Sequence, residues 1–225
     1  MNLIRKIHKA SIILWRQTAG KVLDASKLHF SRKIDEAWRT RLVNYDFTII
    51  APNCAAGLIY HRLGLQFLSP TINLWIEEAH YLRFCQNLRH YLDLPLEFII
   101  PSGRWHPIAM CGDVKIYFNH YKTVEEARNK WEERKKRVNW DNLYLIGDDR
   151  CLSNETDIKV FLEIPCRNHI VFTSKKLNIS GTTHLSSYDG KEHVGYYVMD
   201  QNPFTGLRCY EKEFDVVNWL NSDLA

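Results

Sequence analysis

The stretch from Asp46 to His61 constrains the fold more than any other part of the chain. It reads DFTIIAPNCAAGLIYH: an apolar run, a turn at Pro52 and Asn53, and then a helical pattern over residues 55–63. The β-branched and aromatic residues of the run predict a buried strand over residues 47–51. In α/β sheets, ligands bind at the carboxyl edge, where a strand passes into a helix through such a turn. We therefore expect a ligand site here.

Cys54 follows this turn and stands at the start of the predicted helix. The first turn of a helix presents unpaired N–H groups and a partial positive charge. A cysteine in this position tends to have a lowered pKa and more thiolate. We expect Cys54 to be a nucleophile, and the alternative is a small buried thiol that packs beneath the turn.

Strand and helix patterns alternate along the chain. The patterns predict strands over residues 47–51, 96–100, 114–119, 143–147, 169–173 and 193–199, and helices over residues 55–63, 77–92, 123–138, 154–164 and 214–220. Residues 105–110 fit neither pattern clearly, and residues 178–190 resemble a loop. This order predicts a three-layer α/β/α fold with a largely parallel sheet. Residues 96–120 and the late hairpin-like stretch suggest a smaller mixed α/β subdomain.

The basic charge is concentrated at the start of the chain. Residues 1–41 hold ten Lys or Arg against three Asp or Glu, whereas the remainder holds 20 against 23. The body therefore lacks the basic footprint of a nucleic-acid-binding protein. The pattern over residues 3–23 predicts a basic amphipathic helix, typical of segments that lie on anionic membranes. The alternative is a helix that docks on its own domain or on a second subunit.

We predict a basic arm over residues 1–45 and one α/β domain over residues 46–225, which two intertwined subdomains could share. The six cysteines form no Cys-x-x-Cys pair and have no zinc-ligand spacing. The sequence contains neither a recognisable secretory signal nor an apolar run of about 18 residues, the length of a membrane span. We expect a cytoplasmic protein with reduced thiols that can contact the inner membrane face through residues 1–30.

Thiol catalysis requires a base within hydrogen-bond reach of Cys54. His61 lies two helical turns further on, about 10 Å along the axis, and is the weaker candidate. His120 ends the predicted strand at residues 114–119, and it would reach Cys54 if that strand lay beside residues 47–51 in the same sheet. The alternative for His120 is a structural histidine. We expect the N–H groups of Ala55 and Ala56 to stabilise an oxyanion.

Two further groups of residues suggest other chemistry. Asp148 and Asp149 follow a predicted strand and could hold a divalent metal on a nucleotide-sugar diphosphate. The side chains of two adjacent residues tend to diverge, however, which favours a turn or helix-capping role for this pair. The loop over residues 102–106 could cradle an acidic sugar or a phosphate, or it could be a turn around a packed Trp. The candidate substrate-binding residues are Asn53, Gly57, Arg104, His106, Tyr121, Arg134 and Asp149.

Several sequence blocks resemble one bacterial family. They include NCAAG (residues 53–57), LGLQFLSPTINL (residues 63–74), FNHY (residues 118–121), EARNKWEERKKRVN (residues 126–139) and HIVFT (residues 169–173). Across residues 42–175 the chain is similar to proteins labelled "exopolysaccharide biosynthesis protein", domain-of-unknown-function family 1919. The resemblance implies a role in capsule or exopolysaccharide assembly and an α/β fold of two subdomains. It supplies no reaction.

The turn is also similar to that of capsule acetyltransferases that place Asn-Cys after the first strand, although Pro52 and Ala55 depart from their pattern. We therefore expect acyl transfer, with acetyl as the first choice, to a sugar or lipid-linked saccharide. Acetyl-CoA or another acyl donor would supply the acyl group, Cys54 would be the nucleophile, and His120, or less favourably His61, the base. The alternatives are a metal-dependent glycosyl or glycosyl-phosphate transferase that uses Asp148 and Asp149, and a non-catalytic accessory subunit at the membrane surface.

Overall fold

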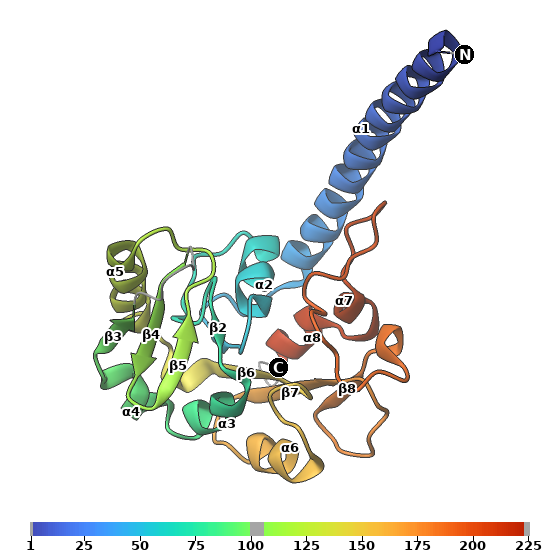
Figure 1. The fold of residues 1–225 in the computed structure, drawn as a ribbon. Coiled ribbons are helices and arrows are strands. Elements are labelled where there is room, and N and C mark those ends of the chain that lie inside the picture. Colours follow the sequence, from blue (N-terminus) through green and yellow to red (C-terminus); the bar gives the residue numbers. More distant parts are fainter. Residues whose placement is uncertain (1, 100–105, 223–225) are drawn as a thin grey trace.

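The structure is a computed structural model that describes residues 2–99 and 106–222. Within the first helix, side chains are described for Gly20 and from Leu23 onward. In this part of the chain the strands form two four-stranded sheets, one parallel and one antiparallel (Figure 1). The predicted α/β class, with a parallel sheet and a smaller mixed unit, is confirmed.

The parallel sheet has the strand order β1 (Thr48–Ile50), β6 (Leu143–Asp148), β7 (Asn168–Thr173) and β8 (Thr182–His184). Successive side chains of a strand point to opposite faces. Ile49 accordingly joins one hydrophobic cluster and Ile50 the other, and Ile146 and Leu145 of β6 divide in the same way. Both faces of the sheet are therefore covered, as parallel sheets require.

Helices cover the two faces of this sheet (Figure 1). The cluster on one face includes residues of α2 (Ala55–Leu63), α7 (Cys209–Glu213) and α8 (Val216–Asn221), together with the end of α1 (Asn2–Arg41). The cluster on the other face includes residues of α3 (Glu78–Gln86) and α6 (Glu155–Leu162). This is the three-layer arrangement that the alternating pattern predicts.

The antiparallel sheet has the order β2 (Trp75–Ile76), β5 (Val114–Tyr117), β4 (Ile108–Cys111) and β3 (Leu96–Ile99). Side chains from α4 (Leu88–Asp93) and α5 (Val124–Lys135) join the cluster that covers it. β2 is tied to the Cys54 turn because the Ile76 N–H donates to the Pro52 carbonyl over 2.9 Å. The second sheet therefore begins at the carboxyl edge of the first.

Three predicted elements differ from the structure. The helix over residues 77–92 is two helices, α3 and α4, which meet at Asn87. The prediction of a strand over residues 193–199 is wrong: Gly195 has a φ of 51°, and this segment forms successive turns. The loop over residues 178–190 contains the edge strand β8, whose pairing with β7 comes from tertiary contact rather than from a local pattern.

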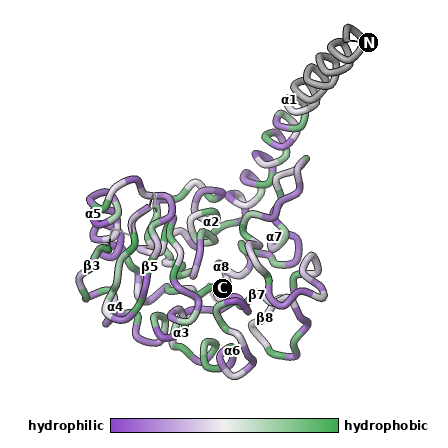
Figure 2. The backbone as a smooth tube through the Cα atoms, in the orientation of Figure 1, coloured by the Kyte–Doolittle hydropathy of each residue, from purple (hydrophilic) through white to green (hydrophobic). Residues whose placement is uncertain are grey.

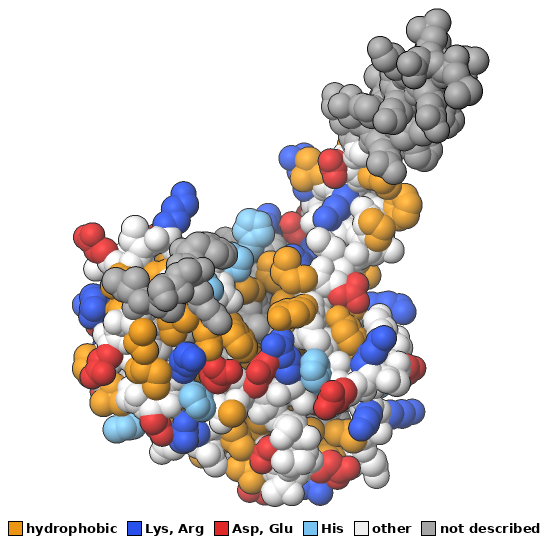
Figure 3. All heavy atoms as spheres, in the orientation of Figure 1, with side chains coloured by type: hydrophobic (Ala, Val, Ile, Leu, Met, Phe, Trp, Pro, Cys, Tyr) orange, Lys and Arg blue, Asp and Glu red, His pale blue; other side chains and the backbone are white. Residues whose placement is uncertain are grey.

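Helix α1 runs to Arg41 without a break and projects from the body (Figure 1). Its last turns join the core, where Trp38 is buried. Hydrophobic and hydrophilic residues alternate along its described part (Figure 2), and Lys, Arg, Asp and Glu side chains are interspersed there (Figure 3). Among the described residues, no helix combines the length and apolarity needed to cross a bilayer.

Candidate functional site

A cavity of about 470 Å³ opens at the carboxyl edge of the parallel sheet. Among the described residues, six segments line it: the turn after β1, the start of β2, residue 106, the end of β5 with the loop after it, the end of β6 with the turn after it, and residues 195–199. Its walls include Cys54, His120, Asp148, Arg150 and Trp75. The predicted ligand edge is therefore hollow in the structure, and both sheets contribute to it.

Cys54 and His120 are in direct contact in this cavity. The Cys54 Sγ lies 3.4 Å from the His120 Nε2, which is hydrogen-bond distance for sulfur. The route differs from the one expected, because β5 belongs to the antiparallel sheet and not to the sheet that contains β1. His120 arrives because β2 is bonded to the Cys54 turn and β5 pairs with β2, so that the loop after β5 ends at the turn.

The Cys54 thiol does not have the lowered pKa expected at a helix start. Burial raises the pKa of Cys54, because a thiolate is costly where little water reaches it. The residue precedes α2 and its side chain makes no capping hydrogen bond. At neutral pH the sulfur therefore carries its proton, and an adjacent base is needed to generate a nucleophile.

Asn53 links the Cys54 turn to the floor of the cavity. Its Oδ1 accepts from the Ala55 N–H over 3.0 Å, and its Nδ2 donates to the Asp148 Oδ2 over 3.1 Å. Ala55 therefore cannot serve as the predicted oxyanion donor while this bond stands. Ala56 and Gly57 follow in the first turn of α2, where N–H groups have no acceptor within the helix.

Of the other residues predicted on α2, Gly57 packs against a neighbouring segment and His61 lies outside the cavity lining. A Cβ added to Gly57 would stand 3.4 Å from the Ile72 Cγ2, which is van der Waals contact, so the helix packs on the segment before β2 at this position. His61 is exposed in the last turn of α2, outside the cavity lining. Its position two turns beyond Cys54 is the one that the helical spacing implied.

Tyr121 and Arg134 are buried behind the cavity wall instead of lining it. The Arg134 Nη1 donates to the Tyr121 hydroxyl over 2.5 Å, and that hydroxyl donates to the Ile72 carbonyl over 2.8 Å. Together they brace the segment on which α2 packs. Their contacts are those of a structural support, and the substrate-binding role predicted for them has no geometric basis here.

The loop predicted to bind an acidic group is described only in part. Arg104 lies outside the described residues. His106 lines the cavity, and its ring centroid lies 6.3 Å from that of Tyr117. The structure therefore brings one of these two candidates to the site.

Asp148 and Asp149 point to different partners. The Asp148 Oδ1 accepts from the N–H groups of Arg150 and Cys151, over 3.2 and 3.1 Å. Burial raises the pKa of Asp148 to about 6, an effect that the Cys151 hydrogen bonds partly offset. Asp149 accepts from Ser174 and from the Val194 N–H, the latter over 2.8 Å, and so it holds two loops together. A shared metal would have to displace these donors.

Aromatic side chains line part of the cavity that contains the thiol, and the sequence patterns did not single them out. Trp75 and Tyr117 stack at a centroid distance of 4.4 Å, and both line the cavity. The Arg150 guanidinium carbon lies 5.7 Å from the Trp75 ring and 4.8 Å from the Tyr196 ring. Arg150 also forms an ion pair with Glu78. The exposure of Tyr196, at 72%, marks it as more than a core residue, but a sequence carries no such signal.

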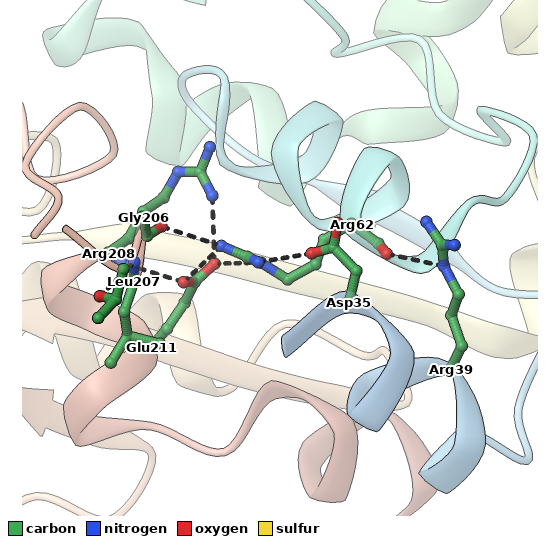
Figure 4. Close-up of polar contacts among 8 residues, drawn as sticks. Asp35, Arg39, Arg62, Gly206, Leu207, Arg208 and Glu211 are labelled. Atoms are coloured by element: carbon green, nitrogen blue, oxygen red, sulfur yellow. Dashed lines mark hydrogen bonds and ion pairs between the residues drawn. The ribbon is translucent and has the colours of Figure 1, made fainter. Parts of the chain in front are cut away.

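The far end of α2 is held by a buried ionic cluster (Figure 4). The Arg62 Nε and Nη2 donate to the two carboxylate oxygens of Glu211, over 2.8 and 2.9 Å. The Arg62 Nη1 donates to Asp35 of α1 over 2.6 Å. The side chains of Arg62 and Glu211 are 3% and 1% exposed. The helix that begins at Cys54 is thereby fixed to α1 and α7.

The structure contains a second thiol–imidazole pair, which serves as a comparison for Cys54 and His120. The Cys166 Sγ lies 3.2 Å from the His169 Nε2, near the amino end of β7. Burial raises the pKa of Cys166 to about 12 and lowers that of His169. Cys166 neither begins a helix nor lines the cavity. The short distance between sulfur and imidazole therefore does not distinguish Cys54 from Cys166. The position of Cys54 at the start of a helix and in the lining of the cavity does.

Comparison with known proteins gives two matches. Residues 25–221 match the family model described as "Domain of unknown function (DUF1919)". The chain is also 31% identical over 189 residues to an uncharacterized protein of Haemophilus influenzae, across 84% of this chain and 90% of the relative. Neither match carries the exopolysaccharide label.

Proposed function

The chain belongs to the DUF1919 family, and we propose that it is an acyltransferase that uses Cys54 as a covalent nucleophile and His120 as its base. The acceptor that we propose is a saccharide hydroxyl, and the acyl group of first choice is acetyl. One observation carries the proposal: the 3.4 Å contact between the Cys54 Sγ and the His120 Nε2 within the cavity.

The chemistry of this pair suits a neutral thiol beside a base. Since burial raises the pKa of Cys54, the thiol keeps its proton until a substrate arrives. His120 can then take that proton as the Sγ attacks, which is general-base activation of a nucleophile. Within the described residues, no carboxylate is hydrogen-bonded to His120, so the arrangement is a dyad.

The first half-reaction transfers the acyl group to the enzyme. The Cys54 Sγ forms a bond to the carbonyl carbon of a thioester or ester donor, and the thiol proton passes to the His120 Nε2. The carbonyl oxygen becomes an oxyanion beside the N–H groups of Ala56 and Gly57. The bond to the donor's sulfur or oxygen then breaks, and this atom leaves with the proton from His120.

The second half-reaction releases the product. The acceptor hydroxyl oxygen attacks the carbonyl carbon of the acyl-Cys54 thioester and gives its proton to the His120 Nε2. The carbon–sulfur bond breaks, and the Cys54 Sγ takes the proton back from His120. The products are an acylated acceptor and the enzyme in its original protonation state.

The cavity wall supports a sugar acceptor. Sugar rings present C–H groups that pack against aromatic side chains, and Trp75 and Tyr196 line the same cavity as the Cys54 thiol. The sequence blocks that resemble exopolysaccharide-biosynthesis proteins support an acceptor from a bacterial surface polysaccharide. We therefore propose that the reaction modifies saccharides during capsule or exopolysaccharide assembly.

The test is acetyl transfer from acetyl-CoA to saccharides purified from the source cells, with the full chain and matched variants. Cys54→Ala should abolish transfer, and His120→Gln should slow it by at least about 100-fold, the contribution of a general base. Cys166→Ala is the matched control, because it removes a thiol from the other thiol–imidazole pair. Full activity in Cys54→Ala would rule out the covalent mechanism.

A further inference from the structure

Asp148 is buried on the floor of the cavity, and every oxygen of its carboxylate is engaged. The side chain is 1% exposed. Its Oδ1 accepts from two backbone N–H groups, those of Arg150 and Cys151, and its Oδ2 accepts from the Asn53 Nδ2. No proposed step of the reaction uses this buried group.

The hydrogen bonds dictate which way the Asn53 amide faces. An ionised carboxylate only accepts hydrogen bonds, so Asn53 must turn its NH₂ group toward Asp148. The amide oxygen then faces the Ala55 N–H, from which it accepts over 3.0 Å. If the amide were reversed, an NH₂ group would face the Ala55 N–H and both bonds would be lost.

Asn53 and Ala55 flank Cys54 on either side in the chain. A bond between the Asn53 side chain and the Ala55 N–H therefore closes a short loop around the nucleophile. We propose that Asp148 is a positioning residue: by orienting the Asn53 amide, it holds the Cys54 turn and the first N–H groups of α2 in place for acyl transfer. Asp148 matters to catalysis only if Cys54 is the nucleophile of the proposed function.

Exchanging the hydrogen-bond donor Asn53 and the acceptor Asp148 tests whether Asp148 orients the Asn53 amide. In Asp148→Asn, the Oδ1 must still accept from the two backbone N–H groups, so the new NH₂ group faces the Asn53 NH₂ group. In Asn53→Asp, two carboxylates face each other. In the double variant Asn53→Asp/Asp148→Asn, the new NH₂ group at position 148 donates to the new carboxylate at position 53. That carboxylate also accepts from the Ala55 N–H, which restores both bonds.

Two measurements compare these variants with the wild-type chain at about pH 8, where Asp148 is ionised. The first is the rate at which p-nitrophenyl acetate acylates Cys54 in the full chain. The second is hydrogen exchange at the Ala55 amide, which requires no reaction. Each single variant should acylate about ten-fold more slowly, the equivalent of one lost hydrogen bond, and Asp148→Asn, which frees the Asn53 amide to reverse, should exchange Ala55 about ten-fold faster. The double variant should return both rates to within about three-fold of wild type.

Asp141→Asn is the control, because Asp141 is exposed just before β6. Rescue in the double variant supports the positioning role, since a merely structural loss would add up instead. Single variants with wild-type rates, or a double variant no better than the singles, would overturn it. If wild-type Cys54 is not acylated at all, the proposed function fails, and the exchange rate of Ala55 still decides whether Asp148 orients Asn53.

Discussion

The reactivity of Cys54 depends on two opposing influences at one atom. The start of α2 favours a thiolate, whereas burial of the side chain disfavours it, and the net effect raises the pKa of Cys54. The thiol is therefore neutral at pH 7, and His120 has to remove its proton during the reaction. This differs from cysteine enzymes in which a thiolate–imidazolium pair is already formed.

Alkylation with iodoacetamide distinguishes these two states. Because the thiolate is the form that reacts, the rate for Cys54 should rise with pH and continue to rise above pH 9, the ordinary pKa of the group. Peptide mass spectrometry measures the rate at Cys54 separately from the other cysteines. A plateau between about pH 6 and 8 would instead indicate a preformed ion pair and contradict the neutral dyad.

At the scale of elements, α2 connects the site to the rest of the fold. Cys54 directly precedes its first residue, and Arg62 in its last turn is fixed by Glu211 and Asp35. A change at Arg62 removes the cation that Asp35 and Glu211 share, and the fully buried Glu211 then keeps only its contact with Arg208.

Arg62→Met should therefore lower the free energy of unfolding by about 3 kcal/mol, the lower end of the range for removing one partner of a buried ion pair, because Arg208 still contacts Glu211. Urea denaturation measures it. Lys159→Met is the control: Lys159 and Glu155 are each 60% exposed, and an exposed pair contributes at most about 1 kcal/mol. Equal losses in the two variants would show that the Arg62 cluster does not anchor α2.

Helix α1 yields a separate prediction about membranes. Five Lys or Arg and no Asp or Glu precede Asp24 in the sequence, and the helix projects from the body (Figure 1). We expect the chain to sediment with vesicles that contain phosphatidylglycerol and not with neutral phosphatidylcholine vesicles. Deletion of residues 1–22 should abolish this binding and leave the unfolding free energy unchanged, because Asp35 remains. Equal binding to both vesicle types would refute an electrostatic contact.

Local chemistry explains which elements could be predicted. Helix α2 spans the predicted residues 55–63, and α5 begins at the predicted cap, where the Thr123 Oγ1 accepts from the Glu126 N–H. Strand β8 and the sheet membership of β5 could not be predicted, because they depend on pairing between distant segments. The break at Asn87 is also invisible in a continuous apolar stripe.

The residues of the candidate site could also be predicted only in part. Cys54 and His120 were foreseeable from residue type, whereas Trp75 and Tyr196 were not, because an aromatic residue in a sequence fits a core equally well. Arg134 illustrates the reverse error: it was a candidate ligand for substrate, but it is buried against Tyr121. Residue type predicts chemistry, and only the fold decides which face of the chain a residue occupies.

At the scale of the whole molecule, the site lies where two sheets meet. Cys54 follows a strand of the parallel sheet, and Trp75 begins a strand of the antiparallel sheet. The acyl group and the acceptor would therefore be held by different sheets. Apart from His120, which follows β5, substitutions on the second sheet should affect the acceptor more than the acylation step.

Trp75→Ala should raise the KM for a saccharide acceptor up to about ten-fold, the value of one aromatic contact, and leave the rate of Cys54 acylation unchanged. Steady-state kinetics with the acceptor and burst kinetics without it separate these effects. Trp140→Ala is the control, since Trp140 lies outside the cavity lining. A loss of acylation in Trp75→Ala would contradict this division of roles.

The central claim is that Cys54 carries the acyl group covalently, and trapping that intermediate tests it most directly. The full chain would be mixed with acetyl-CoA without acceptor, quenched in acid and digested for peptide mass spectrometry. We predict one acetyl group on the peptide that contains Cys54, absent in Cys54→Ser, formed at least about 100-fold more slowly in His120→Gln and retained in Cys166→Ala. Acetyl transfer to a saccharide with no acetyl group ever detected on Cys54, or transfer undiminished in Cys54→Ser, would contradict the account.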